Sequence, residues 1–293
     1  MNKYLRLAFS TYIFWGLFPV FWKLLHHFSA LEILSHRIIW SFAFYSIIYF
    51  GIQKKSFNSI WQIDRKSFLL IVAASALITV NWLIYIWAVN AGHIIEGSLA
   101  YFITPLLNMV MGVYFFQDPW TRLHKIASLC ALVGVLMKGF LSPQFPWIAL
   151  SLALTFSSYG MIKKMLKVPA LLSSTIESGL GLVFAIPLVI FFRTHNTEPL
   201  TYLDGFLLMM SGVVTALPLW FFSLSAQFVP FTTIGFIQFI SPTLQFLVGY
   251  FAFDEGSGVL TWLSFIPIWA GVGIYVMGLL TKNHRKNSSS KNI

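Results

Sequence analysis

The sequence predicts an all-α polytopic membrane protein whose ten transmembrane helices form two inverted five-helix repeats. Hydrophobic residues make up 58% of the 293 residues, charged residues only 10%, and the mean hydropathy is +0.78. A soluble domain carries about a quarter charged residues, so this chain lacks the polar surface that water requires. Its apolar residues form long continuous runs, which indicate spanning helices and not the alternating segments of a barrel.

The length accommodates ten apolar segments of about 20 residues, the length that crosses a bilayer as a helix. Short links with helix breakers such as Asp118-Pro119 separate them. We expect the longest link, around 52–67, to be a loop. The first segment ends without a small-residue cleavage site, so we interpret it as a retained helix. The expected spans are 4–23, 31–51, 68–90, 95–116, 123–141, 145–162, 170–192, 203–225, 230–253 and 259–281.

Lysine and arginine predict the orientation, because short cytoplasmic loops carry an excess of both. With a cytoplasmic N-terminus, 15 of the 19 basic residues fall in cytoplasmic segments, Lys163 among them, while Arg193 falls in an outer link. We therefore expect a multi-pass protein of the bacterial inner (plasma) membrane with both termini cytoplasmic. The net charge of +10 is then a topology signal and not a nucleic-acid patch. The polar tail 282–293 is expected to be disordered.

An internal repeat divides the chain into two halves. The segment 100–112 matches the segment 237–249 at an offset of 137 residues, and the same offset relates Gly134 to Gly271. Each half holds five expected spans, an odd number, so the second half begins on the opposite side of the membrane. The expected units are a first repeat at 1–141, an inverted second repeat at 142–281, and the tail at 282–293.

This inversion predicts a secondary transporter, because equivalent motions can open a site between inverted halves to either face. We expect a permease for small organic metabolites or drug-like compounds, working by alternating access in export or exchange. An exchanger or uptake carrier of nucleotide-like cofactors is a second interpretation within transport. A membrane-embedded sensor or enzyme on a transporter-like fold is the alternative outside it. The expected partners are a small-molecule substrate and the lipid bilayer, and the chain is a monomer or a homodimer.

Two polar stripes related by the repeat are the strongest candidates for a substrate cavity. Spacings of four, seven and eleven residues place each stripe on one helix face. A proline in each stripe permits bending, so these prolines are expected hinges. The alternative is packing, since amides and small residues also join helices. The stripes are Tyr101, Pro105, Asn108 and Gly112, and Gln238, Pro242, Gln245 and Gly249.

The expected third span adds Asn81, Tyr85, Trp87 and Asn90 to the predicted cavity. Tyrosine and tryptophan offer a large apolar body with one polar tip, which suits amphipathic ligands. A tryptophan near a helix end is also a common interface anchor. Asn81 lies well inside the span and is therefore the better candidate.

Charged groups within spans are costly, so their positions are informative. Glu32 and His36 are four residues apart and can pair on one helix face. We expect Arg37 to pair with Glu32, Glu96 or Glu177. An ion pair or snorkelling at the interface is the alternative to ion coupling. The candidates for ion pairing or coupling are Lys23, Glu32, His36, Arg37, Glu96 and Glu177.

Motifs for other chemistry are absent from the sequence. No Walker A motif occurs, and His26-His27 stands without further ligands at metal spacing. The single cysteine, Cys130, excludes an internal disulfide and is interpreted as a small buried hydrophobe. We therefore expect no catalytic residue, no metal and no cofactor, and a protein that is not an enzyme.

Several long motifs resemble the RarD family of EamA-type transporters, within the drug/metabolite transporter superfamily. They are Trp15–Pro19 with Lys23, Glu32–Ser41, Asn81–Asn90, Glu96–Leu106 and Gly235–Leu244, and the similarity extends to about residue 281. Ala100, Thr104 and Gln117-Asp118 depart from the family pattern. The resemblance implies ten helices in inverted repeats, cytoplasmic termini, and secondary transport of metabolites through a central cavity. It also implies that the first, third and fourth helices of each half surround that cavity.

Overall fold

The computed structural model describes residues 3–91, 94–139, 146–195, 200–252 and 259–289. Within these ranges the regular structure is helical and no strand occurs. The first half contains α1 (Lys3–Lys23), α2 (Ala30–Ser46) with its π-helical continuation η1 (Ile47–Ile52), α3 (Asn58–Trp61), α4 (Arg65–Asn90), α5 (Ile94–Phe116) and α6 (Arg122–Gly139). The second half contains α7 (Trp147–Met165), α8 (Ala170–His195), α9 (Tyr202–Phe228), α10 (Phe231–Gln238), α11 (Ile240–Ala252) and α12 (Val259–Ser289).

Within the described ranges, seven helical segments are long and apolar enough to cross a membrane, namely α1, α2 with η1, α4, α5, α8, α9, and α10 with α11. A shorter apolar stretch, Trp262–Gly278, lies within α12. The chain is therefore an all-helical, multi-pass membrane protein. Each expected span corresponds to a helical segment at nearly the same residues, but a count of ten crossings stays a prediction.

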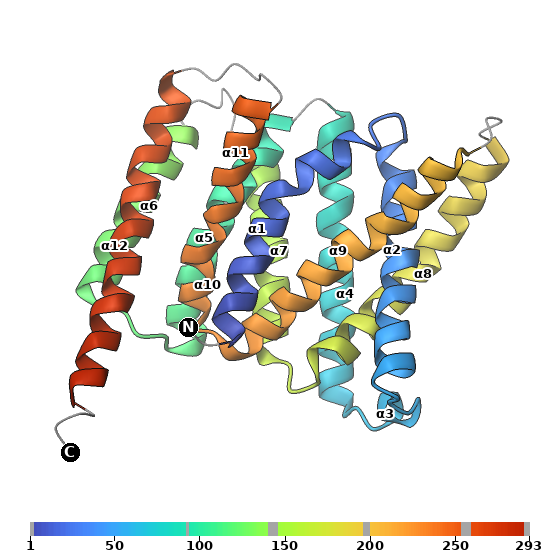
Figure 1. Cartoon of the computed structure of the whole chain (residues 1–293), viewed down its shortest axis with the longest axis horizontal. Coiled ribbons are helices and arrows are strands. Elements are labelled where there is room, and N and C mark those ends of the chain that lie inside the picture. Colours follow the sequence, from blue (N-terminus) through green and yellow to red (C-terminus); the bar gives the residue numbers. More distant parts are fainter. Residues whose placement is uncertain (1–2, 92–93, 140–145, 196–199, 253–258, 290–293) are drawn as a thin grey trace.

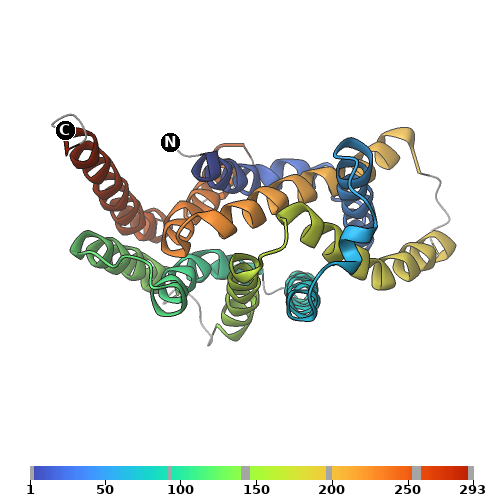
Figure 2. The same cartoon turned by 90° about the horizontal axis from the view of Figure 1, so that it is seen from below.

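The helices stand side by side, with α6 and α12 at one end of the row and α2 and α8 at the other (Figure 1). The start of α1 and the end of α12 lie toward the same edge of the row. From below, α1 and α9 run together on one side of the molecule, and α4 and α7 on the other (Figure 2). Residues of both pairs line the larger of the two cavities described below.

Local hydrogen bonds explain where several helices begin. The Ser29 hydroxyl accepts a hydrogen bond from the Glu32 amide at 3.2 Å and caps α2. At the start of α9, Thr201 and Asp204 form a reciprocal capping box. Before α4, hydrogen bonds from Ser67 hold the pKa of Asp64 below its ordinary value. These caps satisfy amide groups that the first turn of a helix leaves unpaired.

The expected span 230–253 is interrupted at Phe239, between α10 and α11. Pro242 explains the break, because proline has no amide hydrogen to donate to the carbonyl four residues earlier, that of Gln238. By contrast, α5 continues through Pro105 without a break. The two expected hinge prolines therefore act differently on their helices.

Residues that the repeat relates make equivalent contacts between α6 and α12. A Cβ atom added to Gly134 would lie 2.6 Å from the carbonyl oxygen of Ser264, and one added to Gly271 would lie 2.5 Å from that of Ala127. Both pairs, 134 with 271 and 127 with 264, are separated by the offset of 137 residues. Such distances leave no room for a side chain, so glycine permits the close approach of both helices.

Four expectations near helix ends need correction. Lys163 is not a loop residue, because α7 continues to Met165 and encloses its side chain. Arg193 lies within α8 and not in a link. The link 52–67 contains the short helix α3 and the start of α4. The tail is helical as far as Ser289 and not disordered there, while 290–293 lie outside the described residues.

Candidate functional site

A cavity of about 380 Å³ lies between the two halves of the chain. Helices α1, α2, α4 and α5 of the first half and α7, α9, α10 and α11 of the second contribute its walls. Its size falls within the range of small-molecule sites, about 300–1,000 Å³. Seven of the residues that the sequence singled out line this cavity: Arg37, Asn81, Tyr85, Tyr101, Gln238, Pro242 and Gln245.

Gln238 is held in place by two partners from the first half. The Asn108 side-chain amide donates to Gln238 Oε1 at 2.7 Å, and the Tyr12 hydroxyl donates to the same oxygen at 3.5 Å. Asn108 itself is fully buried and does not line the cavity, so it supports the wall from behind. The expected cavity role of Asn108 is thus replaced by a positioning contact between α5 and α10.

The other two amides combine cavity lining with helix packing. Asn81 donates to the carbonyl of Leu152 and to the hydroxyl of Thr155, both at 2.8 Å, and so joins α4 to α7. Gln245 donates to the carbonyl of Trp15 at 3.1 Å and joins α11 to α1. Both interpretations made from the sequence, cavity lining and interhelical bonding, therefore apply to the same side chains.

Arg37 projects from α2 into the cavity wall. Its Nε donates to the hydroxyl of Thr215 on α9 at 2.9 Å. The guanidinium carbon lies 4.9 Å from the ring centre of Trp22 and 5.1 Å from that of Trp82, within the range of cation–π contact. The expected pairing with Glu32 or Glu177 is wrong, since both carboxylates are paired with other cations.

Aromatic side chains form much of the remaining wall. Trp15 contacts Tyr12 edge-on at 5.4 Å and Phe156 at 5.6 Å between ring centres. Tyr85 and Tyr101 meet edge-on at 6.5 Å on the side formed by α4 and α5. Such a surface is suited to a flat or apolar ligand body.

Trp87 lies outside this cavity. Its side chain is 48% exposed and packs against Trp147 at 5.5 Å between ring centres. This position suits the interface anchor that was the alternative interpretation. The side chains of Asn90 and Glu96 lie outside the described residues, so their predicted roles stay predictions.

At the far end of α2, the predicted pairing of Glu32 with His36 is wrong. Glu32 Oε1 lies 3.3 Å from Nη2 of Arg193 on α8. Nε2 of His36 is buried and has no hydrogen-bond partner in the described part of the chain. Lys23 is exposed at the end of α1. None of these three predicted residues lines the large cavity.

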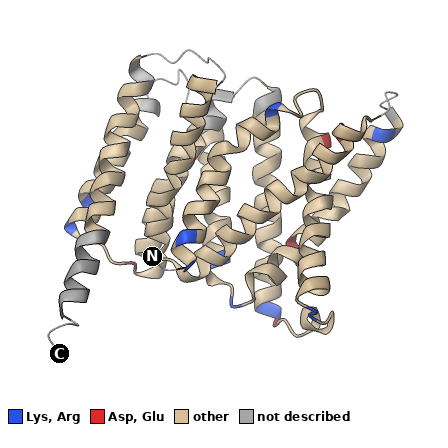
Figure 3. Cartoon of the chain, viewed as in Figure 1, with Lys and Arg blue, Asp and Glu red and all other residues tan. Residues whose placement is uncertain are grey.

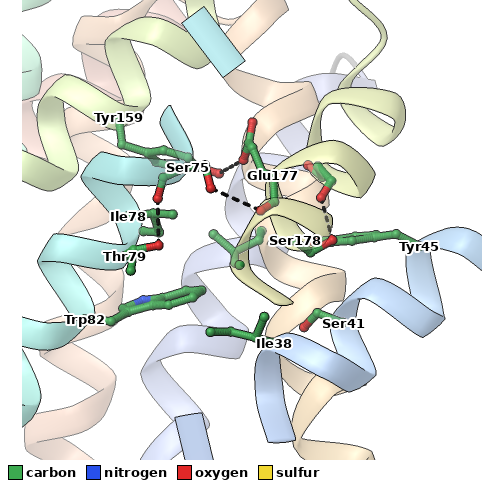
Figure 4. A pocket seen from close by; sticks show the side chains of 13 residues that line it. Ile38, Ser41, Tyr45, Ser75, Ile78, Thr79, Trp82, Tyr159, Glu177 and Ser178 are labelled. Atoms are coloured by element: carbon green, nitrogen blue, oxygen red, sulfur yellow. Dashed lines mark hydrogen bonds between the residues drawn. The ribbon is translucent and has the colours of Figure 1, made fainter. Parts of the chain in front are cut away.

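Glu177 lines a second, smaller cavity of about 40 Å³ (Figure 4). Ile78, Trp82 and Leu219 line both this cavity and the first. Glu177 Oε1 lies 2.6 Å from Nζ of Lys163, and Oε2 accepts from the Tyr159 hydroxyl at 3.3 Å. Lys163 also donates to the hydroxyl of Ser173 at 2.7 Å. This enclosed, hydrogen-bonded pair favours the ion-pair interpretation of Glu177 over a role in coupling.

Several residues of the large cavity escaped the sequence reasoning. Trp22 and Thr215, which both contact Arg37, are the most informative of them. Trp82 stands within the motif Asn81–Asn90 and Trp22 lies outside the quoted motifs, and only the helix arrangement brings both to one guanidinium. Thr215 has no signal in the repeat. Within the described residues, no group of three or more His, Cys, Asp or Glu side chains could hold a metal ion.

Comparisons with known proteins agree with the fold and the membrane character. A model of the EamA-like transporter family matches residues 2–139. An uncharacterized transporter, YojE, from Bacillus subtilis is 36% identical over 90% of this chain and 90% of its own length. Protein RarD from Escherichia coli is 35% identical over 95% of each chain.

A solved crystal structure has the same fold at 13% identity, with a TM-score of 0.74 over 93% of this chain and 97% of the other. At this identity the likeness concerns the fold alone. The family follows from the sequence relatives, which span nearly the whole chain at more than 30% identity. The chain belongs to the RarD-type group of the EamA-like family of membrane transporters.

Proposed function

We propose that this protein is a secondary transporter that moves small organic metabolites or drug-like compounds across the bacterial inner membrane by alternating access, in export or exchange. The cavity between the two halves carries this proposal. Its walls come from both expected repeats, 1–141 and 142–281. A site at the boundary of two halves opens to opposite faces when the halves rock against each other.

The helix contacts support the two-repeat organisation that this mechanism requires. The repeat pairs α1 with α7, α2 with α8, α4 with α9, α5 with α10–α11, and α6 with α12. Exchanging these partners turns the contact of α1 with α9 into that of α7 with α4, and the contact of α2 with α9 into that of α8 with α4. The equivalent glycine contacts of α6 and α12 support the same exchange.

The charge distribution supports cytoplasmic termini. Lysine and arginine gather mainly toward the edge at which α1 begins (Figure 3). Positive residues favour the cytoplasmic side of a membrane. A reporter enzyme that is active only outside the cytoplasm, fused after α12, is expected to stay inactive. An active reporter would contradict this orientation.

Counterflow in proteoliposomes tests the transport proposal. Compounds that stabilise the purified protein against heat would be loaded inside, and uptake of the labelled compound would be followed. We expect saturable uptake that depends on the internal compound. A ligand that binds but is never moved would overturn the proposal and favour a sensor or enzyme on this fold.

A pair of bulky substitutions ties transport to the cavity. Ile33 lines it, whereas Ile47 is 62% exposed in η1 and lies outside it. We expect Ile33→Trp to abolish counterflow by filling the cavity and Ile47→Trp to retain it. Equal activity of both variants, at equal amounts of folded protein, would exclude this cavity as the route.

A further inference from the structure

Arg37 is a charged group in a surrounding that otherwise disfavours charge. A cation within a membrane-spanning helix is costly unless an anion or another polar group compensates it. Among the described residues, no carboxylate lies within ion-pair distance of Arg37, and only Nε has a hydrogen-bond acceptor. Contacts with Trp22 and Trp82 compensate part of the charge.

Arg37 lines the cavity, and its two Nη groups have no hydrogen-bond acceptor among the described residues. Arg37 is the single Lys, Arg, Asp or Glu among the residues that line it, all of which belong to the described part of the chain. The hydroxyl of Thr215 donates to the carbonyl of Ser211 at 2.8 Å, so its oxygen is oriented to accept from Arg37 Nε. This bond fixes the direction of the guanidinium and leaves its two Nη groups for a ligand.

Two of the three acidic residues expected to pair with Arg37 have other partners. Glu32 pairs with Arg193, and Glu177, which lines the smaller cavity and not the large one, pairs with Lys163. The cavity therefore presents one positive charge, amide and hydroxyl groups, and aromatic rings. A cationic ligand would be repelled there, and a zwitterion would find no carboxylate for its ammonium group.

We propose that the transported substrate is an organic monocarboxylate with an apolar or aromatic body, whose carboxylate is bound by Arg37. This inference rests on the proposed function, of which it names the substrate class. The planar guanidinium offers two parallel N–H groups that match the two carboxylate oxygens. The tryptophans that flank Arg37 and the aromatic rings around the cavity then contact the apolar body.

A matched set of four ligands tests the charge requirement by calorimetry on the purified protein. The set is 3-phenylpropionate, its neutral amide, the cation 3-phenylpropylamine, and the zwitterion phenylalanine. A hydrogen-bonded charge pair accounts for about tenfold to a hundredfold in affinity. We expect the carboxylate to bind at least about tenfold more tightly than the other three.

Three variants assign that preference to Arg37. Arg37→Gln is expected to bind the carboxylate and its amide equally, and Arg37→Lys to retain a reduced preference for the carboxylate. Arg193→Gln is the matched control, because it removes the same charge at a position that does not line the cavity. It is expected to keep the full preference. If Arg37→Gln fails to fold, the affinities of the four ligands for the parent protein and for Arg37→Lys still test whether the cavity prefers a carboxylate.

The outcomes separate this inference from the proposed function. Binding of the amide or the amine as tight as that of the carboxylate, no binding of the carboxylate, or an unchanged preference in Arg37→Gln would overturn the inference. Counterflow of a neutral or cationic compound would overturn it as well, while the transport proposal would stand. Tight binding of the carboxylate without counterflow would support Arg37 as its site and overturn transport.

Discussion

Arg37 and Lys163 are both cations held among apolar helices, but their surroundings differ. Lys163 is fully buried, lies 2.6 Å from Glu177, and donates to Ser173. Arg37 lies at a cavity, has one hydroxyl acceptor, and rests between two tryptophans. The buried charge of Lys163 is thus compensated by a carboxylate of the protein, whereas the charge of Arg37 is compensated only in part. The comparison teaches that Arg37, which has no carboxylate partner among the described residues, and not the paired Lys163, is the group available to a ligand.

The paired cation joins helices of the second half. Lys163 is on α7, while Glu177 and Ser173 are on α8. Glu177 also contacts the first half, since its carbonyl accepts from the Ser75 hydroxyl of α4 at 3.1 Å. We interpret this cluster as a structural link between α7, α8 and α4.

The largest expected effect comes from breaking the structural pair. Lys163→Met leaves the Glu177 carboxylate buried without its cation, which costs about 3–5 kcal/mol in other buried pairs. We expect a large drop in the thermal midpoint of the purified protein. The double variant Lys163→Met/Glu177→Leu leaves no unpaired charge and is expected to recover much of the loss. Additive losses from the two single substitutions would contradict the pair.

Arg37→Gln is expected to change binding and not stability. It should weaken carboxylate binding by about 1.5–3 kcal/mol, the contribution of a hydrogen bond to a charged group. The ligand-free variant should be as stable as the parent protein or more stable, because the substitution removes an incompletely paired charge. Thermal unfolding without ligand measures this. A drop as large as that of Lys163→Met would show that Arg37 is structural too.

Asn108 should have a smaller effect that concerns every ligand equally. Asn108→Ala removes the 2.7 Å hydrogen bond that holds Gln238 at the cavity wall. We expect a loss of about 1 kcal/mol in binding, with the preference for carboxylate unchanged. Tyr12→Phe, which removes the longer 3.5 Å bond to the same oxygen, should have less effect. Titration of the carboxylate and its amide against both variants measures these losses of affinity. Weaker binding of only one of the two ligands would contradict this positioning role.

The smallest effect is expected at Trp87. Its side chain is outside the cavity, so Trp87→Ala should change ligand affinity by less than about 0.5 kcal/mol. Trp82→Ala is the comparison, because Trp82 lines the cavity and contacts Arg37. It should weaken carboxylate binding measurably. Equal effects of the two substitutions would extend the site beyond the cavity described here.

Much of the helical architecture could be predicted, since continuous apolar runs leave few alternatives to spanning helices. The polar stripes likewise led to Gln238 and Gln245 at the cavity. The sequence does not show which face of each helix points to the cavity or which helices are its neighbours. Asn108 and Gln245 occupy equivalent repeat positions, yet one lies behind the wall and the other lines it.

Charge was the least predictable property of the site. The sequence predicts that Lys163 lies in a cytoplasmic link because it follows an apolar segment, but α7 continues past it and Lys163 pairs with Glu177. For Arg37, the sequence suggests three possible carboxylate partners, but it cannot show which of them lies close enough to form an ion pair. The pairing of Glu32 with Arg193 joins residues 161 positions apart, a contact that only the tertiary structure determines.

The most direct test compares the two cations in one experiment. The affinities of 3-phenylpropionate and its amide would be measured for Arg37→Gln and for Lys163→Met/Glu177→Leu. We predict that the preference for the carboxylate disappears in Arg37→Gln and persists in the double variant. A preference that persists in Arg37→Gln, or that disappears with the Lys163–Glu177 pair, would contradict the assignment of ligand recognition to Arg37.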